Sequence, residues 1–233
     1  LWSTGKGYLG QLGLGDTTAR SVPTQVGNLS NWSNVAGGSR CTLAVKTDGT
    51  LWAWGDGAGG SLGLGNTTDY SSPVQVGELT TWSKVGNNND HSKALKTDGT
   101  LWTFGRSVNG EGGMNNTTTY SSPVQIGELT TWANFHCGSG CTMAVKTDGT
   151  LWAWGQNHKG QLGLGDTVTR SSPVQVGSLT DWKVTTGAAQ TIAIKTDGTA
   201  WGWGYGLNGV TGHGDTTDRS SPVQIGSLTT WSF

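Results

Sequence analysis

The heptapeptide Lys46-Thr47-Asp48-Gly49-Thr50-Leu51-Trp52 is the clearest indication of the fold, because the chain carries it four times with almost no change. Its first five residues, Lys-Thr-Asp-Gly-Thr, recur at 96–100, 146–150 and 195–199, at steps of 50, 50 and 49 residues. A fixed period of about 40–50 residues is typical of propeller blades. The chain is therefore predicted to be one array of a single structural unit.

Proline and tryptophan keep the same period and mark the borders of the unit. Each proline stands in a serine-containing stretch that ends in Gln-Val-Gly or Gln-Ile-Gly, and most of the tryptophans fall into two series. These residues are Pro23, Pro73, Pro123, Pro173 and Pro222; Trp32, Trp82, Trp132, Trp182 and Trp231; and Trp2, Trp52, Trp102, Trp152 and Trp201. The predicted organisation is one array over residues 1–233, with full units at 32–77, 82–127, 132–177 and 182–226 and partial units at 1–27 and 231–233.

Four short segments within the unit 32–77 have the residue pattern of β-strands. They cover 32–36, 42–46, 51–54 and 73–77. Asp48-Gly49, between the second and third segments, predicts a two-residue type I′ turn. Pro73 suits an edge strand because proline lacks the N–H that a central strand would donate. No stretch of the chain shows the period of an amphipathic helix.

A four-stranded meander with proline on its last strand is typical of a propeller blade, so the predicted fold class is an all-β propeller. Each of the 13 tryptophans can bury on the order of 200 Å². An isolated blade has two bare faces, so we expect these side chains to pack between neighbouring blades. Because residue 1 is leucine, the chain is expected to be processed or a fragment. It forms either an arc of a longer ring, which we favour, or a five-bladed ring that lacks a strand.

Composition excludes several classes of protein and of partner. The formal net charge is −1 and only 12% of the residues are charged, so the chain has no electrostatic footprint for duplex nucleic acid. Its 40 glycines do not occupy every third position, which excludes collagen. No apolar run approaches the length of a membrane span. The predicted partners are therefore neither nucleic acid nor membrane.

The segment Leu151-Trp152-Ala153-Trp154-Gly155-Gln156-Asn157 is followed by Gly160-Gln161-Leu162-Gly163-Leu164-Gly165-Asp166. Together with Val35–Ala44, this pattern strongly resembles the repeat of the regulator of chromosome condensation family, over the whole chain. The resemblance implies a propeller, commonly with seven blades, in which the Trp32 strand is innermost and the Pro73 strand outermost. The family's usual histidine is kept at His91 and replaced at Cys41, Cys141 and Gln190, a position that we expect to be structural.

Function does not follow directly from that resemblance. Members of the family include a nucleotide exchange factor for a small GTPase that docks on nucleosomes, a β-lactamase inhibitor, and many bacterial and viral repeat proteins. An exchange factor would need a protruding hairpin and basic tails, yet the glycine-to-proline loops here all have one length. The uniform repeats and low charge look more like bacterial or phage surface proteins of the family.

A functional surface is predicted where one repeat departs from the others, because binding loops sit on rigid scaffolds. The departures fall in the turns between the first and second strands and in one long loop between the third and fourth strands. Alternate connections of a meander lie on the same side, so these segments are predicted to share one rim, opposite the Asp-Gly turns. The candidate binding residues are Arg40, Asn87, Asn88, Asn89, Asp90, His91, Arg106, Asn109, Glu111, His136 and Gln190.

No catalytic, cofactor or metal site is predicted. His91, His136, Cys137 and Cys141 are metal-ligand types, but no paired Cys-x-x-Cys accompanies them. Gly5-Lys6-Gly7-Tyr8-Leu9-Gly10 has the composition of a nucleotide-binding loop, but no helix follows it. Cys137 and Cys141 form either a local disulfide or two free thiols.

Two functions are compatible with this pattern. The first, which we favour, is a structural or adhesion propeller on a virion or cell surface that binds protein or glycan through the irregular rim and assembles in a larger particle. Its expected location is therefore extracellular or on the virion. The second is a soluble interaction scaffold or regulator, like an inhibitor or an exchange factor. No residue constellation supports an enzyme.

Overall fold

The computed structural model describes residues 1–28, 30–88 and 90–231. The chain divides into two compact units. Unit 1 comprises Leu1–Arg106 and Thr119–Thr130, and unit 2 comprises Ser107–Thr118 and Thr131–Phe233. The chain therefore passes between the two units three times. No helix in the described part of the chain is long and apolar enough to cross a membrane.

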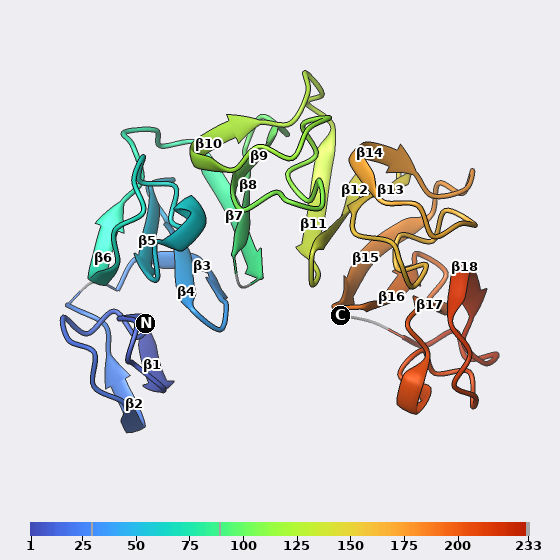
Figure 1. The fold of residues 1–233 in the computed structure, drawn as a ribbon, viewed down its shortest axis with the longest axis horizontal. Coiled ribbons are helices and arrows are strands. Elements are labelled where there is room, and N and C mark those ends of the chain that lie inside the picture. The colour runs from blue at the N-terminus through green and yellow to red at the C-terminus, as the bar shows by residue number, and fades with distance from the viewer. Residues whose placement is uncertain (29, 89, 232–233) are drawn as a thin grey trace. The chain divides into compact units, whose positions relative to one another are not determined.

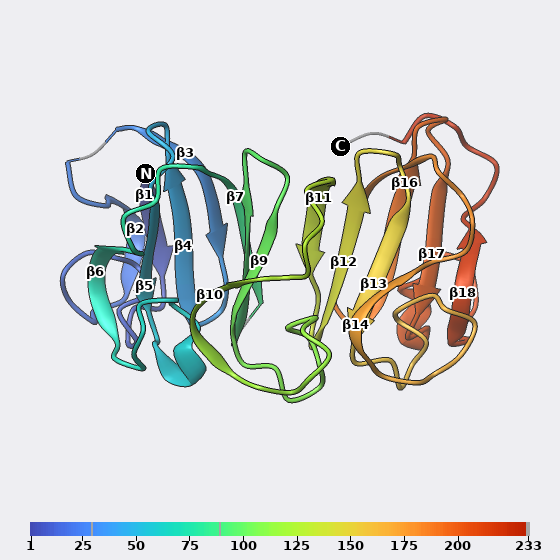
Figure 2. The same ribbon diagram turned by 90° about the horizontal axis from the view of Figure 1, so that it is seen from above.

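Both units are built from antiparallel sheets in which strands follow one another in chain order, as Figures 1 and 2 show. Unit 1 holds a two-stranded sheet, β1 (Trp2–Gly5) and β2 (Arg20–Gln25), and two four-stranded sheets. These are β3 (Trp32–Gly37), β4 (Cys41–Lys46), β5 (Leu51–Gly55) and β6 (Tyr70–Gln75), then β7 (Trp82–Asn88), β8 (His91–Lys96), β9 (Leu101–Gly105) and β10 (Tyr120–Gln125).

Unit 2 repeats the same four-stranded sheet twice. Its strands are β11 (Trp132–Cys137), β12 (Cys141–Lys146), β13 (Leu151–Gly155) and β14 (Arg170–Gln175), then β15 (Trp182–Gly187), β16 (Gln190–Lys195), β17 (Ala200–Gly204) and β18 (Arg219–Gln224). Two short 3-10 turns, η1 (Ala58–Gly60) and η2 (Leu207–Gly209), are the only helical segments among the described residues. The predicted all-β architecture of four-stranded repeats is confirmed.

The proline strand lies at the edge of every sheet, as predicted from the missing N–H of proline. It begins earlier than expected, however, because Tyr70 already pairs with Gly55. The register shifts between that pair and Ala53–Val74, which places a bulge around the strand's centre. Within each unit, the first strands of adjacent sheets contact each other, β3 with β7 and β11 with β15.

The Asp-Gly turns differ from the predicted two-residue type I′ form. The Lys46 N–H donates to Thr50 O at 3.0 Å, and the Gly49 N–H donates to Lys46 O at 2.9 Å. Gly49 has a φ of +77°, whereas Asp48 does not have a positive φ. The turn is therefore a three-residue loop, a type I turn followed by a left-handed glycine. The Asp48 carboxylate favours this form because it accepts hydrogen bonds from the N–H and the hydroxyl of Thr50, at 3.0 and 2.6 Å.

The repeated heptapeptide is a self-contained packing unit. The Thr50 hydroxyl accepts a hydrogen bond from Trp52 Nε1 at 2.9 Å, and Lys46 Nζ lies 3.5 Å from the centre of the Trp52 ring. The same hydroxyl and lysine contacts recur at Trp102, Trp152 and Trp201. A cation over a tryptophan face is attracted by the ring quadrupole. Lys46, Asp48, Gly49, Thr50 and Trp52 of the motif thus each have a defined polar or conformational role.

Hydrophobic cores form between adjacent sheets of a unit. In unit 1, Leu43, Val45 and Leu62 pack against Trp82 and Phe104 of the next sheet. In unit 2, Met143, Val145 and Leu162 pack in the same way against Trp182 and Trp203. The expectation that tryptophans pack between blades is confirmed at these positions.

Two positions in the long loops, four residues apart, change together from repeat to repeat, and the sequence-based predictions did not include them. Asp16 pairs with Arg20 at 2.6 Å, and Asp166–Arg170 and Asp215–Arg219 do the same at 2.6 and 2.8 Å. In the loop with Asn66 the arginine is replaced by Tyr70, and Asn66 Nδ2 donates to its hydroxyl at 3.3 Å. The arginine hydrogen bond lowers the pKa of Asp16 and of Asp215.

Substitution of Gly49 by alanine should destabilise the protein more than substitution of Gly77. A Cβ at Gly49 would lie 2.1 Å from Thr80 O, whereas one at Gly77, where φ is +60°, would meet no atom within 4 Å. Gly77→Ala should therefore cost only the about 1–2 kcal/mol of a left-handed alanine. Urea denaturation measures both variants, and equal midpoints would contradict the turn packing.

Acid should weaken the protein partly through the Asp–Arg loops. The folded-state pKa of Asp16 and Asp215 lies below the unfolded value, so their stabilisation is present above that value and is lost as pH falls through the folded pKa. The double variant Asp16→Asn/Asp215→Asn should therefore lose less Tm than the wild type between pH 6 and pH 3. Adding Arg20→Tyr and Arg219→Tyr transplants the Asn66–Tyr70 pairing as a control. An unchanged acid profile in both variants would refute the assignment.

Candidate functional site

The turns that follow the first strands and the loops that follow the third strands lie at the same end of each sheet. The Asp56 N–H donates to Arg40 O at 3.0 Å, and the Arg106 N–H donates to Asp90 O at 2.8 Å. Unit 2 repeats this bond from Gln156 to Gly140 O and from Tyr205 to Ala189 O. We call this end the variable rim. The Asp-Gly turns lie at the other end, where Gly49 O accepts the Trp82 N–H at 3.0 Å.

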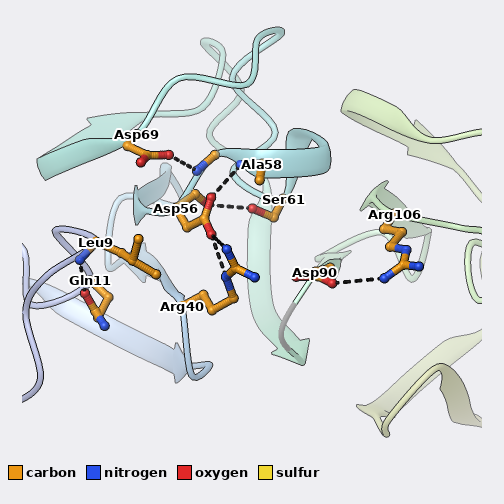
Figure 3. Close-up of polar contacts among 10 residues, drawn as sticks. Leu9, Gln11, Arg40, Asp56, Ala58, Ser61, Asp69, Asp90 and Arg106 are labelled. Carbon is orange, nitrogen blue, oxygen red and sulfur yellow. Dashed lines mark hydrogen bonds and ion pairs between the residues drawn. The ribbon is translucent and has the colours of Figure 1, made fainter.

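Two ion pairs stand on the variable rim of unit 1, and Figure 3 shows both. Arg40 Nε donates to Asp56 Oδ2 at 2.5 Å, and its Nη2 contacts the same oxygen. The other Asp56 oxygen accepts the Ala58 N–H at 2.7 Å. Asp56 is buried, and its charge, ahead of smaller contributions from Asp90 and Asp69, raises the pKa of Arg40. Arg40 thereby ties the turn to the long loop.

The second pair is looser and more exposed. Arg106 Nη1 lies 3.4 Å from Asp90 Oδ2, and the two side chains are 53% and 33% exposed. Exposed pairs at such a distance add little to stability. This ion pair can therefore break at a small cost in free energy, and each group can then pair with a charged group of a partner protein.

The two ion pairs occupy identical repeat positions with the charges reversed. Arg40 and Asp90 stand at one turn position, and Asp56 and Arg106 stand at one loop position, 50 residues apart in each case. In unit 2 the same positions hold the uncharged pairs Gly140 with Gln156 and Ala189 with Tyr205. Asp56 was not among the predicted binding residues, although the exchange of charge between aligned repeats identifies it.

The asparagines beside the first-strand turn are partly used inside the fold. Asn87 Nδ2 donates to Cys41 O at 3.1 Å and contacts Cys41 Sγ at 3.2 Å. Asn88 is half-buried at the end of β7 and pairs with His91, which is buried. Asn89 lies outside the described residues. The structure thus brings Arg40, Asn87, Asn88, Asp90, His91 and Arg106 together on one rim of unit 1.

The remaining candidates, Asn109, Glu111, His136 and Gln190, lie in unit 2. His136 Nε2 lies 2.6 Å from Gly187 O and 3.1 Å from Gly187 N, and so it links β11 to β15. The buried Glu111 carboxylate accepts the Asn109 N–H at 2.6 Å. Gln11 and Gln161 make the same bond within their loops. Gln190 is half-buried at the start of β16. Of these candidates, His136 and Glu111 make side-chain contacts inside the fold.

The three cysteines are buried and none is in a disulfide, so of the two alternatives for Cys137 and Cys141 the structure holds two thiols. Burial raises the pKa of the Cys41 thiol to about 11 and that of Cys141 to about 12. Such thiols are poor nucleophiles, because the thiolate is the reactive form. Across the described residues, no group of three or more histidine, cysteine or acidic side chains could hold a metal ion.

Comparison with solved structures finds similar folds. Human WBSCR16 matches with a TM-score of 0.85 and 21% identity, over 97% of this chain and 62% of that one. Prp20p of Saccharomyces cerevisiae, described with its binding to Gsp1p and histones, matches with a TM-score of 0.84 and 19% identity, over 98% and 59%. Prp20 bound to Kap60 gives 0.83, 19%, 94% and 54%. The chain thus spans about three-fifths of the length of the first two proteins.

Comparison of the amino-acid sequence with known families identifies the repeat. No curated protein sequence matches the chain. The regulator of chromosome condensation (RCC1) repeat matches residues 1–45, 48–95, 98–145 and 148–194, which together cover most of the sequence. With the repeat matched in four successive segments and its four-stranded sheets in place, the chain belongs to the regulator of chromosome condensation repeat family.

Proposed function

We propose that this chain is a protein-interaction module without catalytic activity, and that it binds a partner protein through the variable rim. The observation that carries the proposal is the reversed charge pair of unit 1. The repeats keep Lys-Thr-Asp-Gly-Thr unchanged at the Asp-Gly turns, yet at the opposite rim they place Arg40–Asp56 in one blade and Asp90–Arg106 in the next. Arg40, Asp90 and Arg106 remain partly exposed on this rim, and such a mixed pattern of charge favours specific recognition of a partner with the complementary pattern.

The solved relatives support a protein partner rather than another class. Prp20p is described by its binding to Gsp1p and histones, and a second structure holds it with Kap60. None of these relatives is described as a surface adhesin or a glycan-binding protein, so we place virion or cell-surface adhesion, glycan binding and particle assembly second to an interaction scaffold.

A role in nucleotide exchange is the narrower alternative. The loops between third and fourth strands, at 6–19, 56–69, 106–119, 156–169 and 205–218, all have the same length. None therefore adds a hairpin of its own that could enter a GTPase. We propose binding rather than exchange as the activity of this part of the protein.

The test measures binding of purified Gsp1p and of core histones to the immobilised protein, with two matched variants. Arg106→Ser removes the most exposed charge of the two rim ion pairs, and Lys183→Ser removes an exposed lysine of β15 away from the rim. We expect Arg106→Ser to weaken binding about tenfold and to reduce its salt dependence, with Lys183→Ser unchanged. If neither protein binds, a photo-crosslinker at position 106 or 183 selects the partner from extract. Cross-links from 183 alone would contradict the rim assignment.

A further inference from the structure

Each unit contains a groove at the outer junction of its two four-stranded sheets, away from the variable rim. In unit 1 the groove has a volume of about 310 Å³ and walls that include Leu64, Leu79, Trp82, Trp102 and Pro123. Unit 2 has a groove of about 390 Å³ with Leu164, Leu179, Trp182, Trp201 and Pro222 at the same repeat positions. These junction grooves have the size of small binding sites.

The walls of the junction groove suit an uncharged ligand. No ionisable residue lines the groove of unit 1. The nearby Lys96 ammonium lies over the Trp102 ring at 3.8 Å, and in unit 2 the lining Arg170 is paired with Asp166. Leu79 and Leu179 remain 47% and 43% exposed on the linkers beside the grooves. The electrostatic complement of such a site is therefore a neutral, largely apolar segment.

One tryptophan in each groove has a donor without an acceptor. Trp82 and Trp182 are only 3% exposed, and their indole N–H groups make no hydrogen bond to any residue that the structure describes. The neighbouring Trp102 and Trp201 donate their N–H groups to Thr100 and Thr199, both at 2.9 Å. A buried donor without an acceptor is unfavourable, and a ligand oxygen would satisfy it. The indole N–H groups of Trp32 and Trp132 are likewise without an acceptor among the described residues, so the unpaired donor recurs at this position of each repeat.

We propose that each junction groove binds a proline-rich, extended segment of a partner protein. Such a segment packs its pyrrolidine rings on tryptophan, leucine and proline side chains, which is the usual mode of recognition by aromatic grooves. It offers carbonyl acceptors and, at proline, no N–H that needs an acceptor in return. The only gap in the groove's own hydrogen bonding is a donor, since none of the lining side chains has a buried oxygen without a partner.

A sugar fits this balance less well, because its hydroxyls require donors and acceptors in similar number. The polar lining of the unit 1 groove is limited, and Gln75 Nε2 already donates to Gly77 O at 3.0 Å. Both indole nitrogens are covered in the unliganded protein, so a ligand carbonyl reaches them only as the groove widens. Binding must therefore change the environment of these two N–H groups. The site does not depend on the variable rim being a binding surface.

The experiment follows the indole N–H signals of the ¹⁵N-labelled protein by NMR during titration with a ten-residue polyproline peptide. The Trp82 and Trp182 signals should shift downfield together, as each gains an acceptor. Trp54, Trp154 and Trp203 are internal controls, because their N–H groups already donate to loop carbonyls. Unchanged signals from Trp82 and Trp182 at millimolar peptide would overturn the proposal.

Variants at the linker leucines locate the binding without disturbing the core. Leu79→Ser and Leu179→Ser should each weaken peptide binding at their own groove about tenfold. Leu228→Ser is the matched control, because Leu228 has the same repeat position and is 60% exposed but lines neither groove. Equal effects of all three substitutions would refute the site. Chitotriose is titrated in parallel. A shift of the same two signals by the sugar alone would assign the grooves to a glycan ligand and overturn the proposal of a peptide ligand.

Discussion

A buried aromatic ring that packs on the loop of the preceding repeat joins adjacent sheets, and this ring is Trp54, Phe104, Trp154 or Trp203. Trp54, Trp154 and Trp203 donate their N–H groups to the main-chain oxygens of Gln11, Glu111 and Gln161 at 3.0–3.1 Å. A single blade exposes two apolar faces, so its stability depends on its neighbours. The indole ring covers the apolar face of its own sheet while its N–H donates to a loop carbonyl. One side chain thereby fixes both the distance between the loop and the sheet and the position of the loop along the sheet. The loop carbonyls at Gln11, Glu111 and Gln161 also accept threonine hydroxyls from the next sheet.

The same loops protect the sheet edges. The main-chain N–H of Gly15 donates to Ser71 O, and the equivalent bonds run from Gly65 to Ser121 O and from Gly165 to Ser220 O. These acceptors belong to proline strands, which are the edge strands of their sheets. An edge strand with free polar groups invites pairing with other chains. Proline removes a donor, and the loop of the preceding repeat occupies an acceptor, so a β-rich chain keeps its edges from pairing.

Much of this fold was predictable because the same residues recur at equivalent positions in several copies of the repeat. The period gave the units, and the alternation of residues gave the strands. The turn type was wrong because Asp-Gly is compatible with two turns, and the choice depends on Thr50, whose hydroxyl and N–H hold Asp48 in the right-handed region. The start of the proline strand was displaced because the Tyr70–Gly55 pair precedes a bulge that no residue pattern marks.

The candidate site was harder to predict for a related reason. Divergence between repeats marks positions that changed, but a change can serve an internal contact as well as a surface. His136 and Glu111 differ from their counterparts, and both are engaged with neighbouring main-chain groups. Arg40 could only be interpreted together with Asp56, a residue that no single-repeat comparison singles out. Paired positions across aligned repeats carry more information about such contacts than either position alone.

The division of the chain into units has a consequence for how such arrays grow. Strands β9 and β10 belong to unit 1, yet the loop that joins them, Ser107–Thr118, belongs to unit 2 and there accepts the Trp154 N–H. The stretch of sequence that forms one sheet is therefore not the stretch that completes one junction. A gene duplication or deletion that spans one full period keeps the spacing of strands and loops at every junction, wherever its breakpoints fall. The number of repeats can thus change in evolution without breakpoints at one fixed position of the repeat, because no single position is the required start of a blade.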